Sequence, residues 1–183
     1  MLSSINIILQ FVFHLACMLF IVRFLLQASQ ADFYNPISQA IVKATDPVCA
    51  PIRKILPGFK NLDFTSILVA WLVAAIGIYA VTYINYGSGP TLASAAWVGL
   101  IEMLMVLIQF YQFSLLIVVI ASFLAQGSYH PALALLHQLM EPLLGPIRRI
   151  LPSLGPLDLS PMVLFLIIIV VQNLLAQSMP RML

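Results

Sequence analysis

The sequence predicts an all-α membrane protein with four transmembrane helices in two parallel repeats. Each repeat is a helix, a basic amphipathic segment and a second helix. Hydrophobic residues make up 62% of the 183 residues and charged residues only 8%, whereas soluble domains hold about 45–50% apolar and about 25% charged residues. Four apolar runs approach the roughly 20 residues that cross a bilayer. The two longer stretches between these runs are copies of each other.

The same composition excludes several classes of protein. The polar side chains are too few to cover the surface of a water-soluble domain. A net charge of +2 is too small for a nucleic-acid-binding surface, which needs clustered Lys and Arg. No HExxH, GxSxG or dinucleotide-binding motif is present, so we expect neither an enzyme nor a cofactor. Cys17 and Cys49 lack the spacing of a metal site or a disulfide framework.

The first repeat is predicted over residues 1–84. Its first span covers about 5–26, with no basic residue before it, which argues against a cleaved signal peptide. An amphipathic segment follows at 35–62, and the second span covers 64–84. We therefore expect the first span to stay in the membrane and to target the chain there.

The second repeat is predicted over residues 97–183, after a short linker at 85–96 that is rich in Gly, Ser and Pro. Its spans are expected at about 97–125 and 161–176, on either side of an amphipathic segment at 130–157. The last span is short, and its resemblance in position to the span at 64–84 supports it.

The repeat is most evident in the two amphipathic segments. Residues 35–63 and 130–158 align at a constant offset of 95, with ten identical pairs among 29 positions. Because each half contains two spans, both halves start from the same membrane face, and the repeat is parallel rather than inverted. The repeated prolines and acids are Pro36, Asp46, Pro47, Pro51, Pro57 and Asp63 in the first copy and Pro131, Glu141, Pro142, Pro146, Pro152 and Asp158 in the second.

The prolines divide each segment. Asn35 before Pro36 predicts a capped helix start, and apolar residues then recur at helical spacing. A proline restrains the residue before it from helical geometry, so Asp46-Pro47 and Glu141-Pro142 are expected to end this helix and begin another short piece. We expect the helices to lie in the headgroup region of the membrane.

The basic residues predict the orientation. Residues 27–63 contain four Lys or Arg, and the segment 126–160 contains two, whereas the linker at 85–96 contains none. Basic loops remain in the cytoplasm. Both amphipathic segments are therefore expected on the cytoplasmic side and both termini on the periplasmic side.

The motif NPI…TDPVCAPIRKILP…LDFTS and its copy EPLLGPIRRILP…LDLSP resemble the signature of the YggT family of bacterial integral membrane proteins, to which YlmG proteins are related. Two repeats are typical of the proteobacterial type. The second copy departs from the pattern with His130 in place of Asn and without an equivalent of residues 32–34. The resemblance implies an inner-membrane protein linked to osmotic or ion homeostasis, cell division or assembly of membrane complexes, and it brings no catalytic residues.

The sharpest functional candidates are four basic residues, Arg53, Lys54, Arg148 and Arg149. Clustered cations beside a cytoplasmic interface attract anionic lipid headgroups or the acidic surface of a partner. The structural alternative is that they set the topology and pair with Asp63 or Asp158, ten residues later.

Carboxylates before two of the spans have two interpretations. Asp63 and Asp158 could perform acid–base chemistry, but they stand where a helix starts, so N-capping is the better explanation. Arg23 lies inside the first apolar run, near its cytoplasmic end, and we expect it to extend to the membrane surface.

A candidate ion path comprises the polar residues of the spans. Charged residues inside a span often have a functional role. Glu102 could bind a cation together with His14, Gln109, Gln172 and Asn173. The alternative is that these side chains only bridge helices. No metal site is expected, because His130 and His137 are two turns apart.

Two functions follow from these residues. The first is a non-enzymatic interaction or assembly factor that contacts anionic lipids or a partner through its basic segments. The second is an ion channel or channel subunit in osmotic or ion homeostasis. Four helices bury limited area, so we expect a homo-oligomer or a membrane-protein partner. Small residues at Ala70, Ala74, Gly77 and Ala80 would allow close helix approach.

Overall fold

The computed structural model describes residues 2–54, 56, 62–124, 130–151 and 158–179. Within these residues the chain is helical, with no strand, which confirms the predicted all-α class. The described part forms the helices α1 (Leu2–Ala28), α2 (Pro36–Arg53), α3 (Phe64–Tyr86), α4 (Leu92–Leu124), α5 (Pro131–Ile150) and α6 (Ser160–Gln177).

Among the described residues, four helices are long and apolar enough to cross a membrane, namely α1, α3, α4 and α6. They begin and end within five residues of the predicted limits. The largest shift is at α4, where the Thr91 hydroxyl accepts a hydrogen bond from the Ser94 amide at 3.2 Å and so supports an earlier helix start. α3 ends at Gly87 with φ 69°, a left-handed conformation that glycine adopts without strain. The connection is therefore shorter than the linker predicted at 85–96.

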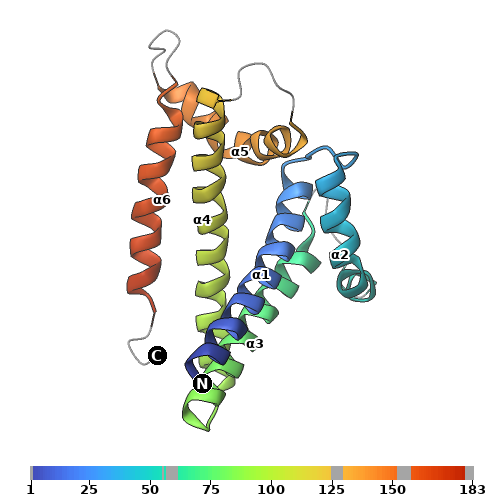
Figure 1. Cartoon of the computed structure of the whole chain (residues 1–183), viewed down its shortest axis with the longest axis vertical. Coiled ribbons are helices and arrows are strands. Elements are labelled where there is room, and N and C mark those ends of the chain that lie inside the picture. Colours follow the sequence, from blue (N-terminus) through green and yellow to red (C-terminus); the bar gives the residue numbers. More distant parts are fainter. Residues whose placement is uncertain (1, 55, 57–61, 125–129, 152–157, 180–183) are drawn as a thin grey trace.

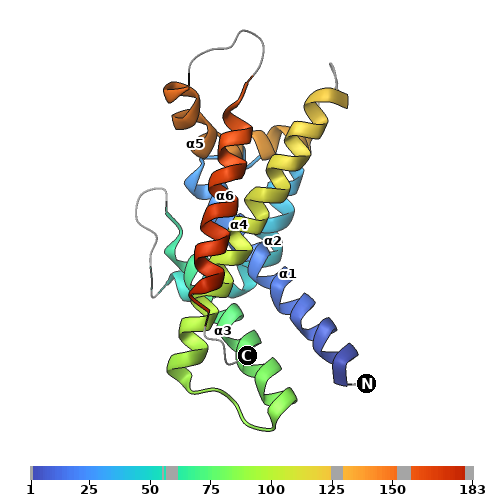
Figure 2. The ribbon, with the colours of Figure 1, turned by 90° about the vertical axis from the view of Figure 1, so that its left-hand side faces the viewer.

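The two halves share a pattern of helix contacts, although α2 runs alongside its spans and α5 lies across the end of α4 (Figures 1 and 2). In each half the second span lies against the first, α3 against α1 and α6 against α4, and α4 also lies against α3. The amphipathic helix α2 contacts both α1 and α3, as α5 contacts both α4 and α6. α1 begins and α6 ends at the end of the molecule away from α5 (Figure 1).

The apolar core has two parts, and the larger one extends across both halves. The larger part surrounds Leu26, Cys49 and Val106, and the smaller part surrounds Leu115 and Met140. The half-buried side chain of Tyr111 packs against both. α2 buries Cys49 in the larger part, whereas α5 contributes Leu135 and Leu139 to the larger part and Met140 and Leu144 to the smaller one.

Small residues bring the spans close together, as the sequence suggests. Ala70, Ala74 and Gly77 are buried on α3. A Cβ atom at Gly77 would lie 2.9 Å from Phe13 Cβ on α1, which is too close for any side chain there. A tryptophan joins α3 to α4, because Trp71 Nε1 donates to the Ala96 carbonyl at 2.8 Å.

The starts of α2 and α5 meet and connect the two repeats. The Asn35 side chain accepts from the Ile37 amide at 2.9 Å, and its Nδ2 donates to the Pro131 carbonyl at 2.8 Å. The Asp32 amide donates to Gln138 Oε1 at 2.8 Å. Residues 32–35, which depart from the repeat pattern, thus form part of the junction between the halves.

The prediction that Asp46-Pro47 and Glu141-Pro142 end their helices is wrong. α2 continues past Pro47 to Arg53, and α5 continues past Pro142 to Ile150. A proline inside a helix removes one backbone hydrogen bond and bends the helix, and need not end it. Figure 1 shows both ribbons changing direction along their length.

Candidate functional site

A buried arginine organises the charged cluster of the first repeat. Arg23, on α1, is only 6% exposed, and its guanidinium lies beside two acidic residues from other elements. Nη2 lies 2.6 Å from Asp46 Oδ1 on α2, and Nε lies 3.5 Å from Asp63 Oδ2 before α3. Nη1 donates to Thr45 Oγ1 at 2.6 Å. The cluster therefore ties three helices together.

The expectation that Arg23 extends to the membrane surface is wrong. The side chain stays inside because α2 and the start of α3 fold against the end of α1 and bring oxygen acceptors to it. A buried charge is stable only when it is paired and hydrogen-bonded. The signal in the sequence was the charge itself inside an apolar run, because such a charge needs a partner. The spacing of the residues did not identify that partner.

Asp63 is the acceptor at the centre of the cluster. Its carboxylate is 1% exposed and accepts from Arg53 Nη2 at 2.6 Å and from the Ser66 hydroxyl at 2.8 Å. Burial raises the pKa of the Asp63 carboxyl, but the hydrogen bonds from Ser66 and Arg53 and the charges of Arg53 and Arg23 lower this pKa below its ordinary value. Asp63 stands at the N-cap position of α3 without a side-chain capping bond. The carboxylate therefore holds basic residues instead of capping the helix.

The second repeat has a smaller, open version of this cluster. Arg148 Nε lies 2.9 Å from Asp158 Oδ2, and Arg148 Nη1 lies 3.0 Å from Glu141 Oε2. Asp158 Oδ1 also accepts from the Ser160 amide at 2.9 Å, next to the start of α6. Burial raises the pKa of Asp158, whereas the bonds from Ser160 and Arg148 lower it below its ordinary value. The hydrogen bond to Asp158 raises the pKa of Arg148.

The structure divides the four predicted basic residues into two pairs. Arg53 and Arg148 bind the aspartate ten residues later in their own repeat. Lys54 and Arg149, their neighbours, are exposed, and neither forms an ion pair within the described part of the chain. Arg53 and Arg148 are thus engaged by carboxylates of the chain, whereas Lys54 and Arg149 have no such partner among the described residues.

The repeated prolines occupy matching places. Pro36 and Pro131 are the first residues of α2 and α5, each after a side-chain cap from Asn35 or His130. Histidine thus replaces asparagine in the second copy with its capping role retained. Four more prolines, Pro47, Pro51, Pro142 and Pro146, lie within the helices, whereas Pro57 and Pro152 fall outside the described residues.

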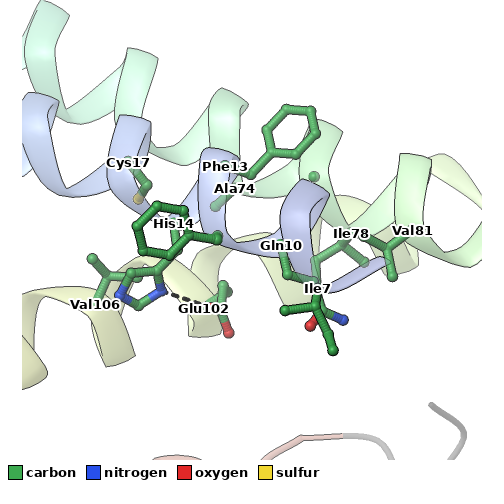
Figure 3. Close-up of a pocket in the computed structure, with 12 residues that line it drawn as sticks. Ile7, Gln10, Phe13, His14, Cys17, Ala74, Ile78, Val81, Glu102 and Val106 are labelled. Carbon is green, nitrogen blue, oxygen red and sulfur yellow. Dashed lines mark ion pairs between the residues drawn. The ribbon is translucent and has the colours of Figure 1, made fainter. Parts of the chain in front are cut away.

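A cavity of about 470 Å³ lies between α1, α3 and α4 (Figure 3). Gln10, His14 and Glu102 form its polar wall, and Phe13, Gly77 and Val106 are among its apolar residues. His14 Nδ1 lies 3.7 Å from Glu102 Oε1, and the two side chains are 38% and 35% exposed. Figure 3 shows the imidazole and the carboxylate pointing toward each other. The pair places a carboxylate where a cation could bind.

The other members of the candidate ion path do not join this cavity. Gln109 is not among the cavity-lining residues, and Asn173 lines a separate pocket near the end of α6. The Asn173 amide donates to Ile169 of its own helix at 3.0 Å. Gln172 bridges α6 to α4 through Gln112 at 2.8 Å. The described residues therefore do not form a continuous polar path.

No three His, Cys, Asp or Glu side chains within the described ranges are placed to hold one metal ion. Cys17 and Cys49 are unpaired thiols, and both lie in the larger part of the core. Each thiol contacts a polar group of α3: Cys17 Sγ lies 3.5 Å from the Ala70 carbonyl, and Cys49 Sγ lies 3.7 Å from the Ser66 hydroxyl.

Comparison with known proteins matches both halves of the chain. The family model described as CCB3/YggT matches residues 2–84 and again 97–179. An uncharacterized protein of Pseudomonas aeruginosa is 40% identical over 95% of this chain and 92% of its own length. A protein of Vibrio alginolyticus encoded in the proC 3' region is 39% identical over 90% of this chain and 89% of its own length. The uncharacterized YggT protein of Escherichia coli is 35% identical over 92% of this chain and 87% of its own length. No solved structure matches.

Proposed function

The chain belongs to the CCB3/YggT family, and from that premise we propose that it is a non-enzymatic interaction or assembly factor of the bacterial inner membrane. The basic ends of α2 and α5 are its contact points for anionic headgroups and for a partner complex. The family resemblance implies that it acts in osmotic-stress tolerance, cell-envelope maintenance or division.

The observation that carries this proposal is the pair Lys54 and Arg149. The two residues are at equivalent positions in the repeats, and both are exposed. Their neighbours Arg53 and Arg148 are held by ion pairs, so a role within the fold accounts for those two arginines, whereas Lys54 and Arg149 form no ion pair among the described residues. Cations beside an anionic membrane surface gain about 1 kcal/mol each.

The arrangement of the helices supports an orientation. The amphipathic helices α2 and α5 contain Lys43, Arg53, Arg148 and Arg149, and Lys54 follows α2 directly. The connection after Tyr86 has no basic residue. By the positive-inside rule, α2 and α5 face the cytoplasm, and the start of α1 and the end of α6 face the periplasm.

The test is a double variant, Lys54→Gln with Arg149→Gln. Native mass spectrometry of the chain, extracted gently from its own membrane, counts bound phosphatidylglycerol and partner proteins. Loss of about 2 kcal/mol of attraction corresponds to about 30-fold weaker anionic lipid binding, with an unchanged melting temperature. The matched control Lys54→Arg with Arg149→Lys keeps both charges and should bind as the wild type does. Unchanged lipid retention and unchanged partners in the neutral variant would contradict the proposal.

Ion conduction is the second candidate function, and the His14–Glu102 pair in its cavity favours it. Purified chain in liposomes should then pass monovalent cations, and Glu102→Gln should reduce the flux. Asn173→Leu is a suitable control because Asn173 lies in a different pocket. Absence of flux from folded, correctly inserted protein would eliminate a stand-alone channel.

A further inference from the structure

The charged clusters of the two repeats are unequal copies. The first contains two cations, Arg23 and Arg53, against two carboxylates. The second contains Arg148 alone against Glu141 and Asp158. The residue that aligns with Arg23 in the second repeat is Ser122, whose hydroxyl donates to the Val119 carbonyl of its own helix at 2.7 Å. The second cluster thus lacks one positive charge that the first possesses.

Neighbouring segments do not supply the missing charge. Residues 125–129 and 152–157, which connect α5 to the adjacent spans, contain no Lys or Arg in the sequence. Arg149, on α5 itself, forms no ion pair with either carboxylate within the described residues. One negative charge of the second cluster is therefore left without a cation from this part of the chain.

The second cluster is also accessible from outside. Asp158 is 43% exposed and Glu141 is 61% exposed, whereas their counterparts Asp63 and Asp46 are 1% and 49% exposed, so the difference lies mainly at the aspartate before the second span. The Arg23 side chain contributes to the closure of the first cluster, where it lies against both Asp46 and Asp63. The second repeat has no such side chain at the aligned position, and among the described residues Arg148 alone contacts both of its carboxylates.

We propose that Glu141 and Asp158 accept a basic side chain, an arginine, from a partner protein in the same membrane. The first repeat provides the template, because there a guanidinium bridges the equivalent carboxylates, with Nη2 2.6 Å from Asp46 and Nε 3.5 Å from Asp63. Guanidinium groups suit such sites, since their planar fork of donors matches carboxylate oxygens.

This inference rests on the proposed role as an interaction factor and specifies the chemistry of the partner. It uses different residues from the lipid contact at Lys54 and Arg149. Anionic lipid cannot satisfy an excess carboxylate, so the two contacts can fail independently. By analogy with Arg23, the partner arginine would approach near the end of α4, where the aligned residue Ser122 is exposed.

The first experiment supplies the cation within the chain. Ser122→Arg should raise the melting temperature of the purified protein by about 2–4 °C, the shift that one modest favourable interaction gives in a chain of this size. Ser122→Gln should not raise the melting temperature. The increase given by Ser122→Arg should disappear when Glu141→Gln is added to it. Val119→Arg, one turn earlier on the same helix, provides a second placement. No gain from either arginine, or a gain that persists without Glu141, would overturn the proposal.

The second experiment supplies the cation from solution. The probe is N-acetyl-arginine amide, and its uncharged twin is N-acetyl-citrulline amide. At equal concentration and ionic strength, the arginine probe should raise the melting temperature of the wild-type chain and leave that of Ser122→Arg unchanged. An equal response to the two probes, or an undiminished response in Ser122→Arg, would contradict a site for guanidinium.

The third experiment tests whether the occupant belongs to a partner protein. Native mass spectrometry of complexes from the source membrane should show a companion that Ser122→Arg releases and Ser122→Gln retains. A complex whose mass does not change with Ser122→Arg, or one that releases only a second copy of this chain, would overturn the assignment to a partner protein. Lipid retention in the same spectra reports separately on Lys54 and Arg149, so failure of one proposal is distinguishable from failure of the other.

Discussion

Arg23 and Asp63 are 40 residues apart in the sequence, yet Arg23 Nε lies 3.5 Å from Asp63 Oδ2 and both side chains are buried. The contact fixes the end of α1 against the start of α3, with α2 held between them through Asp46.

Removal of the buried arginine should destabilise the protein strongly. Arg23→Gln leaves Asp63 buried with Arg53 as its remaining cation, and loss of one partner of a buried pair costs about 3–5 kcal/mol. Arg148→Gln is the matched control, because its exposed pairs contribute about 0–1 kcal/mol. The measurement is the loss of helical signal with temperature or denaturant for the purified protein. Equal losses of stability in the two variants would contradict the central role of Arg23.

The stability should depend on pH through Asp63. Its pKa in the folded protein lies below the ordinary value of 3.8, so the stabilisation is fully present above pH 3.8 and disappears as the pH falls through the folded-state pKa. The melting temperature of the wild type should therefore fall steeply at acidic pH. Asp63→Asn should melt lower at neutral pH and decline less on acidification. Parallel pH profiles for the two proteins would exclude this explanation.

A methyl group at Gly99 should push α3 and α4 apart. Its Cβ would lie 2.6 Å from Ala75 Cα and 2.7 Å from Ala75 N, and backbone atoms cannot yield as a side chain does. Gly99→Ala should cost about 1–3 kcal/mol of stability, as overpacking generally does. Gly145→Ala should be neutral or stabilising, because its nearest neighbour at 3.3 Å is the mobile carboxylate of Glu141. The melting temperatures of both variants test the contrast.

The amides of α4 and α6 should show a small coupling. Gln172 Nε2 donates to Gln112 Oε1 at 2.8 Å, and hydrogen bonds between membrane helices average about 0.6 kcal/mol. A double-mutant cycle with Gln112→Leu and Gln172→Leu should give this value. A second cycle with Gln109→Leu in place of Gln112→Leu should give none. Similar coupling in both cycles would mean that the amides act non-specifically.

Single cysteines should report the orientation. Lys54→Cys should react with a membrane-impermeant maleimide only after the cytoplasmic side is opened, whereas Ser88→Cys should react in intact spheroplasts. The native thiols need no removal, because Cys17 and Cys49 are 1% and 0% exposed. The reverse pattern of labelling would invert the proposed topology.

The helices could be predicted because their signal is local. The four spans depend on apolar runs, and the starts of α2 and α5 depend on an N-cap followed by Pro36 or Pro131. The course of each helix beyond its inner proline was harder to foresee. A proline removes one hydrogen bond, and tertiary packing can keep the rest, as at the buried Cys49 in α2 and Leu144 in α5.

The charged cluster could be predicted only in part. The pairs Arg53–Asp63 and Arg148–Asp158 follow from a ten-residue separation that both repeats share. The place of Arg23 depends on how α1 meets α2, which is a tertiary contact without a counterpart in the second repeat. The candidate ion path could not be predicted for the same reason. The sequence does not show which polar residues of separate spans lie at the same height and face each other.

The buried Arg23 also has a consequence for biosynthesis. Asp46 and Asp63 are translated 23 and 40 residues after Arg23, which takes about 2–8 s to the second of them at about 5–20 residues per second. Until then the first span carries a charge whose final acceptors have not been synthesised. We therefore expect the end of the first helix to reach its final packing only after the amphipathic segment and the beginning of the next span have emerged.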